Sequence, residues 1–220
     1  MGRLCHQGGM IKVEKYVNQL MTSNCYVVFD NCTKRCVVID PGSEKSEREI
    51  AFLERYGLML DYIFVSHEHT DHNWGVNVLK ERFPAAKIVY SEMCSKWVKK
   101  TIKAYFLLYY DDPDYHYDLM PADILIKRDD DVLSWNGGNI IFVQTPGHSR
   151  GSMCIYLNNM LFTGDTIMPY KPYFNGRDSN EEDWQKSIEK MENFIPLETA
   201  VYPGHGETLT FKEWLENFKP

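Results

Sequence analysis

The sequence predicts a layered α/β fold, and three observations support this prediction. Short apolar runs alternate with amphipathic segments in the first half of the chain, a pattern typical of βαβ units. Paired apolar runs also flank strong turn sequences, of which Asn136-Gly137-Gly138 is the clearest, so antiparallel hairpins are expected. The chain has 220 residues, 44% of them hydrophobic and 14% aromatic, which suits a substantial core in one large domain or two small ones.

The first half is expected to start with an antiparallel hairpin and to continue with strand–helix–strand units. Pro41-Gly42 ends the third expected strand, and Ser43 or Ser46 can cap the helix that follows. Pro84 ends the second expected helix, because the residue before a proline disfavours helical backbone angles. The expected elements are strands over 11–20, 24–30 and 36–40, a helix ending near Tyr56, a strand over 61–65, a helix over 74–82 and a strand over 87–90.

The second half is expected to contain two more hairpins, a pair of helices and a final strand. Asn158-Asn159 separates two apolar runs and predicts a tight turn between them. Trp184, Ile188 and Met191 lie on one face of a predicted amphipathic helix. The expected elements are strands around Leu133 and over 140–144, 153–157, 160–162 and 200–202, and helices over 181–194 and 211–218.

One short stretch combines residue types that bind metal ions. It reads Ser66-His67-Glu68-His69-Thr70-Asp71-His72 and follows the expected buried strand 61–65. Imidazole nitrogens and carboxylate oxygens are the ligands that zinc and similar ions prefer. A turn at the end of a strand can direct His67 and His69 into one cleft and Asp71 and His72 to an adjacent position. For this stretch alone, an ordinary solvated loop is the alternative.

Three further candidate ligands occur in short turns later in the chain. They are His148 in Thr145-Pro146-Gly147-His148-Ser149, Asp165 in Thr163-Gly164-Asp165-Thr166, and His205 in Pro203-Gly204-His205-Gly206. With these turns the chain resembles the metallo-β-lactamase-fold hydrolases, which share the His-x-His-x-Asp-His motif and, in the same order, a later His, Asp and His. The resemblance extends from about Val13 to the C-terminus.

The resemblance implies a four-layer αββα sandwich, in which two mixed β-sheets stack and helices cover their outer faces. It also implies two divalent metal ions, with zinc expected and iron or manganese as alternatives. The implied ligands are His67, His69 and His148 for one ion, Asp71, His72 and His205 for the second, and Asp165 as a bridge between both. Asp71 is also the implied catalytic residue, because it would orient a metal-bridging hydroxide that attacks a carbonyl carbon without an acyl-enzyme.

Hydroxyl groups near these ligands are expected to hold the imidazole rings through their second nitrogen. Ser66, Thr70 and Thr163 are the candidates, and each can equally be an ordinary turn residue. Glu68 is expected to face away from the ions.

Within the superfamily, the three later turns are most similar to the glyoxalase II-like branch, which hydrolyses thioesters such as S-lactoylglutathione. Arg177-Asp178 is also similar to that branch, so Arg177 is a candidate substrate-binding residue. The chain ends soon after His205. The C-terminal helical domain that contacts glutathione in full-length glyoxalase II enzymes is therefore not expected, and single-domain members are the best match.

Other functions remain open at this point. A persulfide dioxygenase with a single iron is the first alternative, because its motifs overlap and the ligands alone do not select the metal. A lactonase or β-lactamase would use the same hydroxide on a differently shaped substrate. A nuclease is disfavoured by the acidic balance of the chain. A metal-binding scaffold protein without turnover is the non-enzyme alternative.

Residues 11–220 are expected to form a single domain, preceded by a leader or arm at 1–10. The interval between His72 and His148 is longer than expected for the compact thioester-hydrolysing members of the family. This predicts an insertion at about 101–122, which is rich in tyrosine. A lid over the active site and packing against the body or a second subunit are the two interpretations of this insertion. His116 within it is expected not to bind metal, since it does not follow an expected strand.

Charge and cysteine usage narrow the possible partners and location. The formal net charge of −7 argues against an extended nucleic-acid surface, which needs clustered Lys and Arg. No apolar run approaches the roughly 18 residues of a membrane span, and no secretion signal is evident. We expect a cytoplasmic protein with six reduced cysteines, with a Cys32–Cys36 disulfide as the alternative. Its expected partner is a small-molecule acyl substrate, and homo-oligomer formation is possible.

Overall fold

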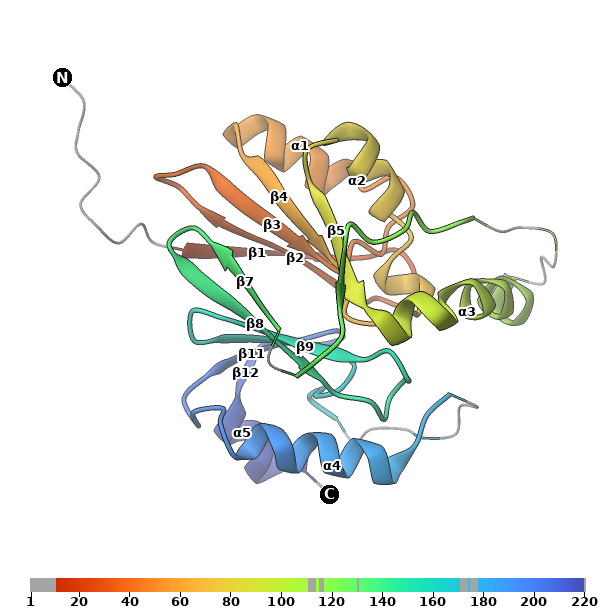
Figure 1. The fold of residues 1–220 in the computed structure, drawn as a ribbon, viewed down its shortest axis with the longest axis vertical. Coiled ribbons are helices and arrows are strands. Elements are labelled where there is room, and N and C mark those ends of the chain that lie inside the picture. Colours follow the sequence, from red (N-terminus) through yellow and green to blue (C-terminus); the bar gives the residue numbers. More distant parts are fainter. Residues whose placement is uncertain are drawn as a thin grey trace.

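In a computed structural model the chain folds into two stacked β-sheets between two layers of helices (Figure 1). The structure describes residues 11–110, 114, 117–129, 131–170, 174 and 178–219, with only the backbone described at 108–110. The predicted four-layer αββα sandwich is thereby confirmed. Residues 1–10, the predicted leader or arm, lie outside the described residues.

The first sheet has its six strands in chain order. They are β1 (Ile11–Val17), β2 (Asn24–Asp30), β3 (Arg35–Ile39), β4 (Met59–Phe64), β5 (Lys87–Ser91) and β6 (Ile124–Ile126). The strands from β1 to β3 pair antiparallel, and those from β3 to β6 pair parallel. The sheet is therefore mixed, and its parallel strands β3 and β4 end at the same edge.

The second sheet is also mixed, with the spatial order β12-β11-β10-β9-β8-β7. Its strands are β7 (Val132–Trp135), β8 (Gly138–Gln144), β9 (Met153–Leu157), β10 (Met160–Gly164), β11 (Ala200–Pro203) and β12 (Leu209–Thr210). All neighbours pair antiparallel except β10 and β11, which are parallel. Strands β8, β10 and β11 therefore run in the same direction, and their C-terminal ends meet at one edge.

Helices cover the outer face of each sheet (Figure 1). On the first sheet lie α1 (Glu47–Tyr56), α2 (Val76–Arg82) and α3 (Glu92–Tyr110), and on the second lie α4 (Glu181–Glu192) and α5 (Phe211–Asn217). A short 3-10 helix, η1 (Thr70–His72), follows β4. Asn180 caps α4 by accepting a hydrogen bond from the Asp183 N–H, and Thr210 caps α5 in a reciprocal capping box with Glu213.

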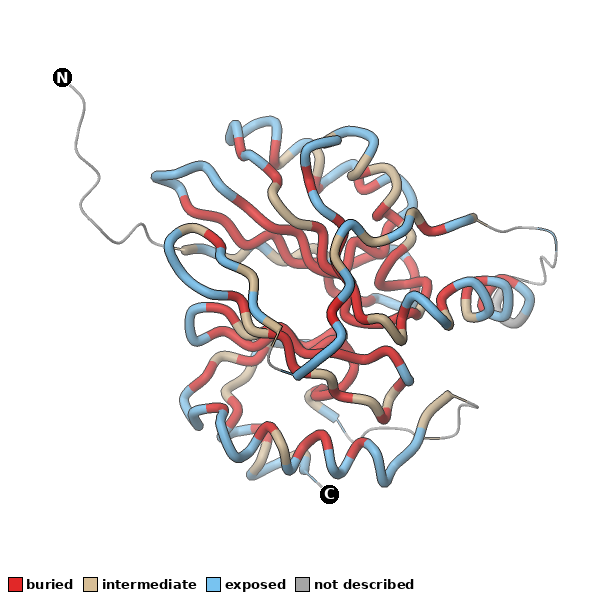
Figure 2. Tube along the Cα trace, in the orientation of Figure 1, coloured by how far each residue is buried: buried red, intermediate tan, exposed pale blue. Residues whose placement is uncertain are grey.

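The alternation of side chains along the strands produces the layers. On β2, Cys25 and Val27 face the helices, whereas Tyr26 and Val28 face the other sheet. A third apolar cluster, which includes Trp184, joins the second sheet to α4 and α5. The buried residues in Figure 2 follow the two sheets and the inner faces of the helices.

Helix α3 and the end of β1 differ from the sequence prediction. Cys94, Val98 and Ile102 are buried four residues apart, so α3 forms one apolar stripe that begins well before the predicted insertion. Tyr105 and Phe106, which belong to the insertion, pack in the core between α3 and the first sheet. Strand β1 ends at Val17 rather than at residue 20, because the chain turns there and the Asn18 N–H donates to the Ser23 carbonyl (2.7 Å).

Cys36 is a free thiol, so the alternative Cys32–Cys36 disulfide is wrong. Within the described residues, no helix combines the length and the apolar character needed to cross a membrane.

Candidate metal centre

The first four candidate ligands lie on one turn at the end of β4. They are His67, His69, Asp71 and His72. The turn is fixed at its start because the Ser66 N–H donates to Asp40 Oδ1 (2.7 Å) and the Ser66 carbonyl accepts from the Met153 N–H of the second sheet (2.9 Å). It then enters η1, which places Asp71 and His72 beside each other. His67 and His72 have no solvent exposure.

The other three candidate ligands follow three strands of the second sheet. His148 lies in the turn after β8, Asp165 directly follows β10, and His205 follows β11. Since these strand ends share one edge, residues far apart in sequence come together there. Gly204 makes the approach of the last two turns possible, because a Cβ atom at that position would lie 2.1 Å from Asp165 Oδ1.

We define the first donor group as His67, His69, His148 and Asp165, whose ligand atoms lie within 4.8 Å of one another. His69 Nδ1 is 3.0 Å from His67 Nε2 and 3.0 Å from His148 Nε2. Asp165 Oδ2 lies 3.3 Å from His148 Nε2. Three imidazole nitrogens and one carboxylate oxygen therefore converge on one point, as a tetrahedral metal site requires.

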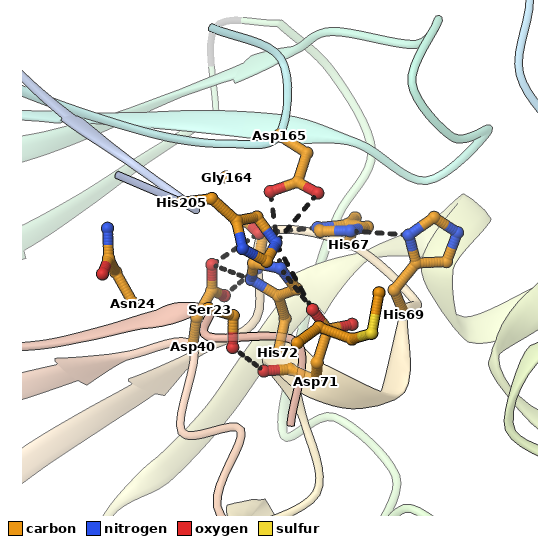
Figure 3. A network of polar contacts seen from close by, with 12 residues as sticks. Ser23, Asn24, Asp40, His67, His69, Asp71, His72, Gly164, Asp165 and His205 are labelled. Atoms are coloured by element: carbon orange, nitrogen blue, oxygen red, sulfur yellow. Dashed lines mark hydrogen bonds and ion pairs between the residues drawn. The ribbon is translucent and has the colours of Figure 1, made fainter. Parts of the chain in front are cut away.

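We define the second donor group as Asp71, His72 and His205. Asp71 Oδ2 lies 3.4 Å from both His72 Nε2 and His205 Nε2. Asp165 joins the two groups, because its Oδ1 lies 3.4 Å from His72 Nε2 and its Oδ2 lies 3.5 Å from His205 Nε2 (Figure 3). All seven predicted residues thus lie in one cluster, and their individual roles as ligands stay a prediction.

The two groups differ in charge. Burial, followed by the neighbouring imidazoles, holds the pKa of His67 well below its usual range, and burial lowers the pKa of His148 to about 4. In the second group, burial opposes protonation of His72 and His205, but Asp71 and Asp165 outweigh it. The pKa of His72 is raised well above its usual range and that of His205 to about 9.

The two aspartates are correspondingly acidic. Burial alone would raise the pKa values of Asp71 and Asp165, but the adjacent His72 and the other imidazoles lower both below the usual range. Both side chains are therefore carboxylates at neutral pH and available as anionic ligands.

The cluster fits a divalent cation. His72 Nε2 and Asp165 Oδ1 are buried and have no hydrogen-bond partner among the described residues. A buried polar atom without a partner costs about 1–3 kcal/mol, and a cation bound between these two atoms would satisfy both. Imidazole and carboxylate donors together suit zinc and neighbouring transition metals.

Asp40 holds the imidazole rings of two donors, that of His72 directly and that of His67 through Ser66. The sequence did not predict this role. Asp40 Oδ2 lies 3.0 Å from His72 Nδ1 and accepts a hydrogen bond from Ser66 Oγ (2.7 Å). Ser66 Oγ in turn lies 2.9 Å from His67 Nδ1, so the prediction for Ser66 is confirmed. The position of Asp40, directly after a buried strand and before Pro41-Gly42, was the available signal.

The remaining expectations about nearby residues have mixed outcomes. The prediction for Thr163 is wrong, because its hydroxyl donates to the Gly164 and Ile167 carbonyls. Thr70 Oγ1 has no hydrogen-bond partner in the described part of the chain. Glu68 faces away from the donor groups as expected, with its carboxylate on Ser149 and Gly151.

The backbone of Asp71 is also held by residues that the sequence did not indicate. Ser23 Oγ donates to the Asp71 carbonyl (2.5 Å), and Asn18 Nδ2 lies 3.5 Å from the same oxygen. Ser23 and Asp40 lie beside the donors in Figure 3. Arg177 and His116 lie outside the described residues.

Comparison with known proteins defines the class of this site. Residues 19–205 match the family described as the metallo-beta-lactamase superfamily, and this range includes all seven donors. The chain belongs to this superfamily, as its sequence predicted. It is accordingly a metallo-hydrolase by class, with a metal-binding His/Asp cluster at the junction of its two sheets.

The individual proteins that the chain matches have low sequence identity to it. The chain is 30% identical over 193 residues to the probable polyketide biosynthesis zinc-dependent hydrolase BaeB of Bacillus velezensis, covering 87% of this chain and 76% of BaeB. It is 28% identical over 190 residues to hydroxyacylglutathione hydrolase 1 of Vibrio vulnificus, covering 86% of this chain but only 64% of that protein, less than two thirds of its length. The crystal structure of the BLEG-1 B3 metallo-beta-lactamase has the same fold, with a TM-score of 0.82, 24% identity, and coverage of 93% of this chain and 97% of that one.

Proposed function

We propose that the chain hydrolyses a thioester of the glyoxalase II-like type, with water activated by two divalent ions, for which zinc is expected. The position of Asp165 supports the pair of ions in this proposal. Its Oδ2 lies 3.3 Å from His148 Nε2 of the first donor group and 3.5 Å from His205 Nε2 of the second. Two donor groups that share one carboxylate would suit a pair of ions acting on a single substrate.

In this proposal each ion has its own ligand set. The ligands are His67, His69 and His148 for one ion, Asp71, His72 and His205 for the other, and Asp165 for both. Ions of this kind lower the pKa of bound water to about 7, which supplies hydroxide at neutral pH. The zinc-dependent relative BaeB supports zinc over iron or manganese.

Asp71 is the proposed catalytic residue. Its lowered pKa keeps it ionised, and Oδ2 lies 3.4 Å from both His72 Nε2 and His205 Nε2. From this position it can accept a hydrogen bond from the attacking water and orient one of the water's lone pairs toward a carbonyl carbon. Addition of that water to the thioester carbonyl carbon, followed by cleavage of the C–S bond, would give a carboxylic acid and a thiol that share the two protons of the water. No side-chain nucleophile would be required.

The burial of the donors indicates from which side a substrate approaches. His67 and His72 are fully buried at the back of the cluster. The side chains of His148 and His205 are 19% and 15% exposed. A small-molecule acyl substrate would therefore reach the cluster from the side of His148 and His205.

The thioester assignment rests on relatives rather than on the donors themselves. Hydroxyacylglutathione hydrolase 1 supports a thioester, although the alignment covers only 64% of that protein. The glutathione portion of such a substrate is for this reason left out of the proposal. A lactonase or β-lactamase would use the same donors, and a persulfide dioxygenase would need only one iron.

The test is metal analysis of the purified protein together with a substrate panel. We expect two equivalents of zinc per chain, one for each donor group, and hydrolysis of acyl thioesters in preference to esters, lactones and β-lactams. One equivalent of iron with oxygen uptake and sulfite formation from a persulfide would overturn the proposal. A fully loaded protein that is inert toward the whole panel would favour a metal-binding scaffold.

We propose that the protein works in the cytoplasm on a small acyl compound, without nucleic acid or membrane, and that it can form a homo-oligomer. The net charge of −7 supports the absence of a nucleic-acid partner.

A further inference from the structure

We propose that Glu68 is a positioning residue that fixes the turn carrying His148 against the turn carrying His67 and His69. This inference rests on the proposed metal centre and names the contact that shapes its first donor group. Glu68 lies between His67 and His69 in sequence, and only 1% of its surface is exposed. A buried carboxylate needs strong partners, and those of Glu68 lie on the other sheet.

The carboxylate of Glu68 accepts hydrogen bonds from two residues of the His148 turn. Ser149 Oγ donates to Oε2 (3.0 Å), and the Gly151 N–H lies 3.1 Å from Oε2 and 3.2 Å from Oε1. Ser152 completes the arrangement, because its hydroxyl lies 2.8 Å from Ser149 Oγ and accepts from the Ser149 N–H (3.2 Å). Glu68 therefore binds the turn on both sides of Arg150.

Gly151 is shaped to receive this carboxylate. A Cβ atom at residue 151 would lie 2.4 Å from Glu68 Oε2 and 2.6 Å from the backbone N and Cα of Cys94. The Gly151 carbonyl accepts from Ser91 Oγ (2.7 Å), and Ser91 Oγ also accepts from the Cys94 N–H (2.9 Å). The turn is thus pinned between Glu68 on one side and the start of α3 on the other.

The consequence for the first donor group is geometric. His67 and His69 come from the first sheet, whereas His148 comes from the second. The 3.0 Å approach of His148 Nε2 to His69 Nδ1 requires the two turns to hold a fixed separation. Together with the hydrogen bond from the Met153 N–H to the Ser66 carbonyl, Glu68 sets that separation, because it is attached to one turn and hydrogen-bonded to the other. The second donor group does not include the His148 turn and should depend on Glu68 much less.

The test is Glu68→Gln. The Gly151 N–H contacts both carboxylate oxygens of Glu68. In either orientation of the glutamine amide, the NH2 group replaces one of these oxygens, so that two hydrogen-bond donors then meet. We expect zinc affinity at one of the two equivalents to fall about 10- to 100-fold, the usual effect of losing a residue that holds a ligand in place. The other equivalent should bind as in the wild type. Competition with a chromogenic zinc chelator and the visible spectrum of the cobalt-substituted protein measure both.

Glu49→Gln is the matched control. Glu49 is also 1% exposed, but it lies on α1 and belongs to neither donor group, so this variant should bind both equivalents normally. Ser149→Ala removes one donor to Glu68 and should weaken the same equivalent by a smaller factor. The double variant should lose less than the sum of the two single effects in free energy, because both changes break one contact.

The outcomes separate this inference from the proposed function. If the wild type binds two equivalents and Glu68→Gln binds both with unchanged affinity, the role of Glu68 is refuted while the proposed function stands. If Glu68→Gln does not fold, an unchanged affinity in Ser149→Ala refutes it equally. If the wild type binds no metal, the proposed function fails and this inference fails with it.

Discussion

The two donor groups use the same residue types in different charge environments. In the first, imidazoles surround one another, and burial keeps His67 and His148 neutral by lowering their pKa values. In the second, Asp71 and Asp165 raise the pKa values of His72 and His205, so these rings carry protons at neutral pH when no cation is bound. In the proposed centre, the first group could accept a cation without releasing protons, whereas the second would first have to release them.

The largest expected effect comes from the residue that both groups share. Asp165→Asn removes a charge that contacts His148, His72 and His205, so we expect loss of both metal equivalents. Turnover should fall by much more than the about 100-fold loss that is typical when a residue that only positions a ligand is replaced. His67→Ala should empty the first group and spare part of the second. Metal content, with circular dichroism to confirm folding, measures this, and wild-type metal content and activity in either variant would contradict it.

A second expected effect is a difference in pH dependence between the groups. Because the pKa of His205 is raised to about 9, cation binding in the second group must displace protons below that pH. Its affinity should fall by up to about tenfold per pH unit for each proton released. The pKa of His148 is about 4, so affinity in the first group should stay nearly constant across the same range. Zinc titrations from about pH 9 down to about pH 6 test this, and equal slopes for both equivalents would argue against it.

Asp40→Asn should separate the groups by a smaller factor. Asp40 contacts His72 directly at Nδ1 but reaches His67 only through Ser66. We expect an about 10- to 100-fold loss of affinity in the second group and a weaker effect in the first. Ser66→Ala is the matched variant and should weaken binding in the first group more than in the second, because Ser66 contacts His67 directly. The prediction fails if Asp40→Asn weakens both equivalents alike.

The smallest expected effect is on the stability of the metal-free protein. His148 has a folded pKa of about 4, below its unfolded value of about 6.5, so the unfolded chain takes up the proton first and stability falls as pH drops through this window. His205 has a folded pKa of about 9, so it stabilises the fold below about pH 6.5 and this contribution is lost as pH rises toward 9. Denaturant midpoints of chelator-treated protein should therefore peak near neutral pH. A midpoint that changes in one direction only would contradict the opposite charge states of these two rings.

The sequence predicted the seven donors because each occupies a short turn with a recognisable local pattern. Their convergence was implied by the resemblance to the metallo-β-lactamase-fold hydrolases, and the structure brings the last three together because β8, β10 and β11 end at one edge. Asp40 directly follows an expected strand, but it was not predicted, because its role depends on its contacts with Ser66 and His72 across β3 and β4, which the sequence pattern does not specify. Glu68 was predicted to face away, but its partners lie more than 80 positions further along the chain.

The elements show the same division between local and distant information. Hairpins were evident from their turn sequences, and amphipathic helices such as α4 from their periodicity. The predicted cap of α1 is wrong, because Ser46 occupies the N-cap position without a side-chain capping hydrogen bond. The early start of α3 was missed, although Ser91 accepts a hydrogen bond from the Cys94 N–H and marks the start of the helix. The tyrosine-rich composition predicted an insertion at about 101–122, but Tyr105 and Phe106 within this range belong to the core.

Elemental analysis of the purified wild-type chain tests the paired centre most directly. With Asp165 between two donor groups, we predict two equivalents of zinc per chain, of which the more weakly held is lost first as the pH is lowered. If the protein binds no more than one equivalent at every pH where it is folded, the two groups do not hold a pair of ions.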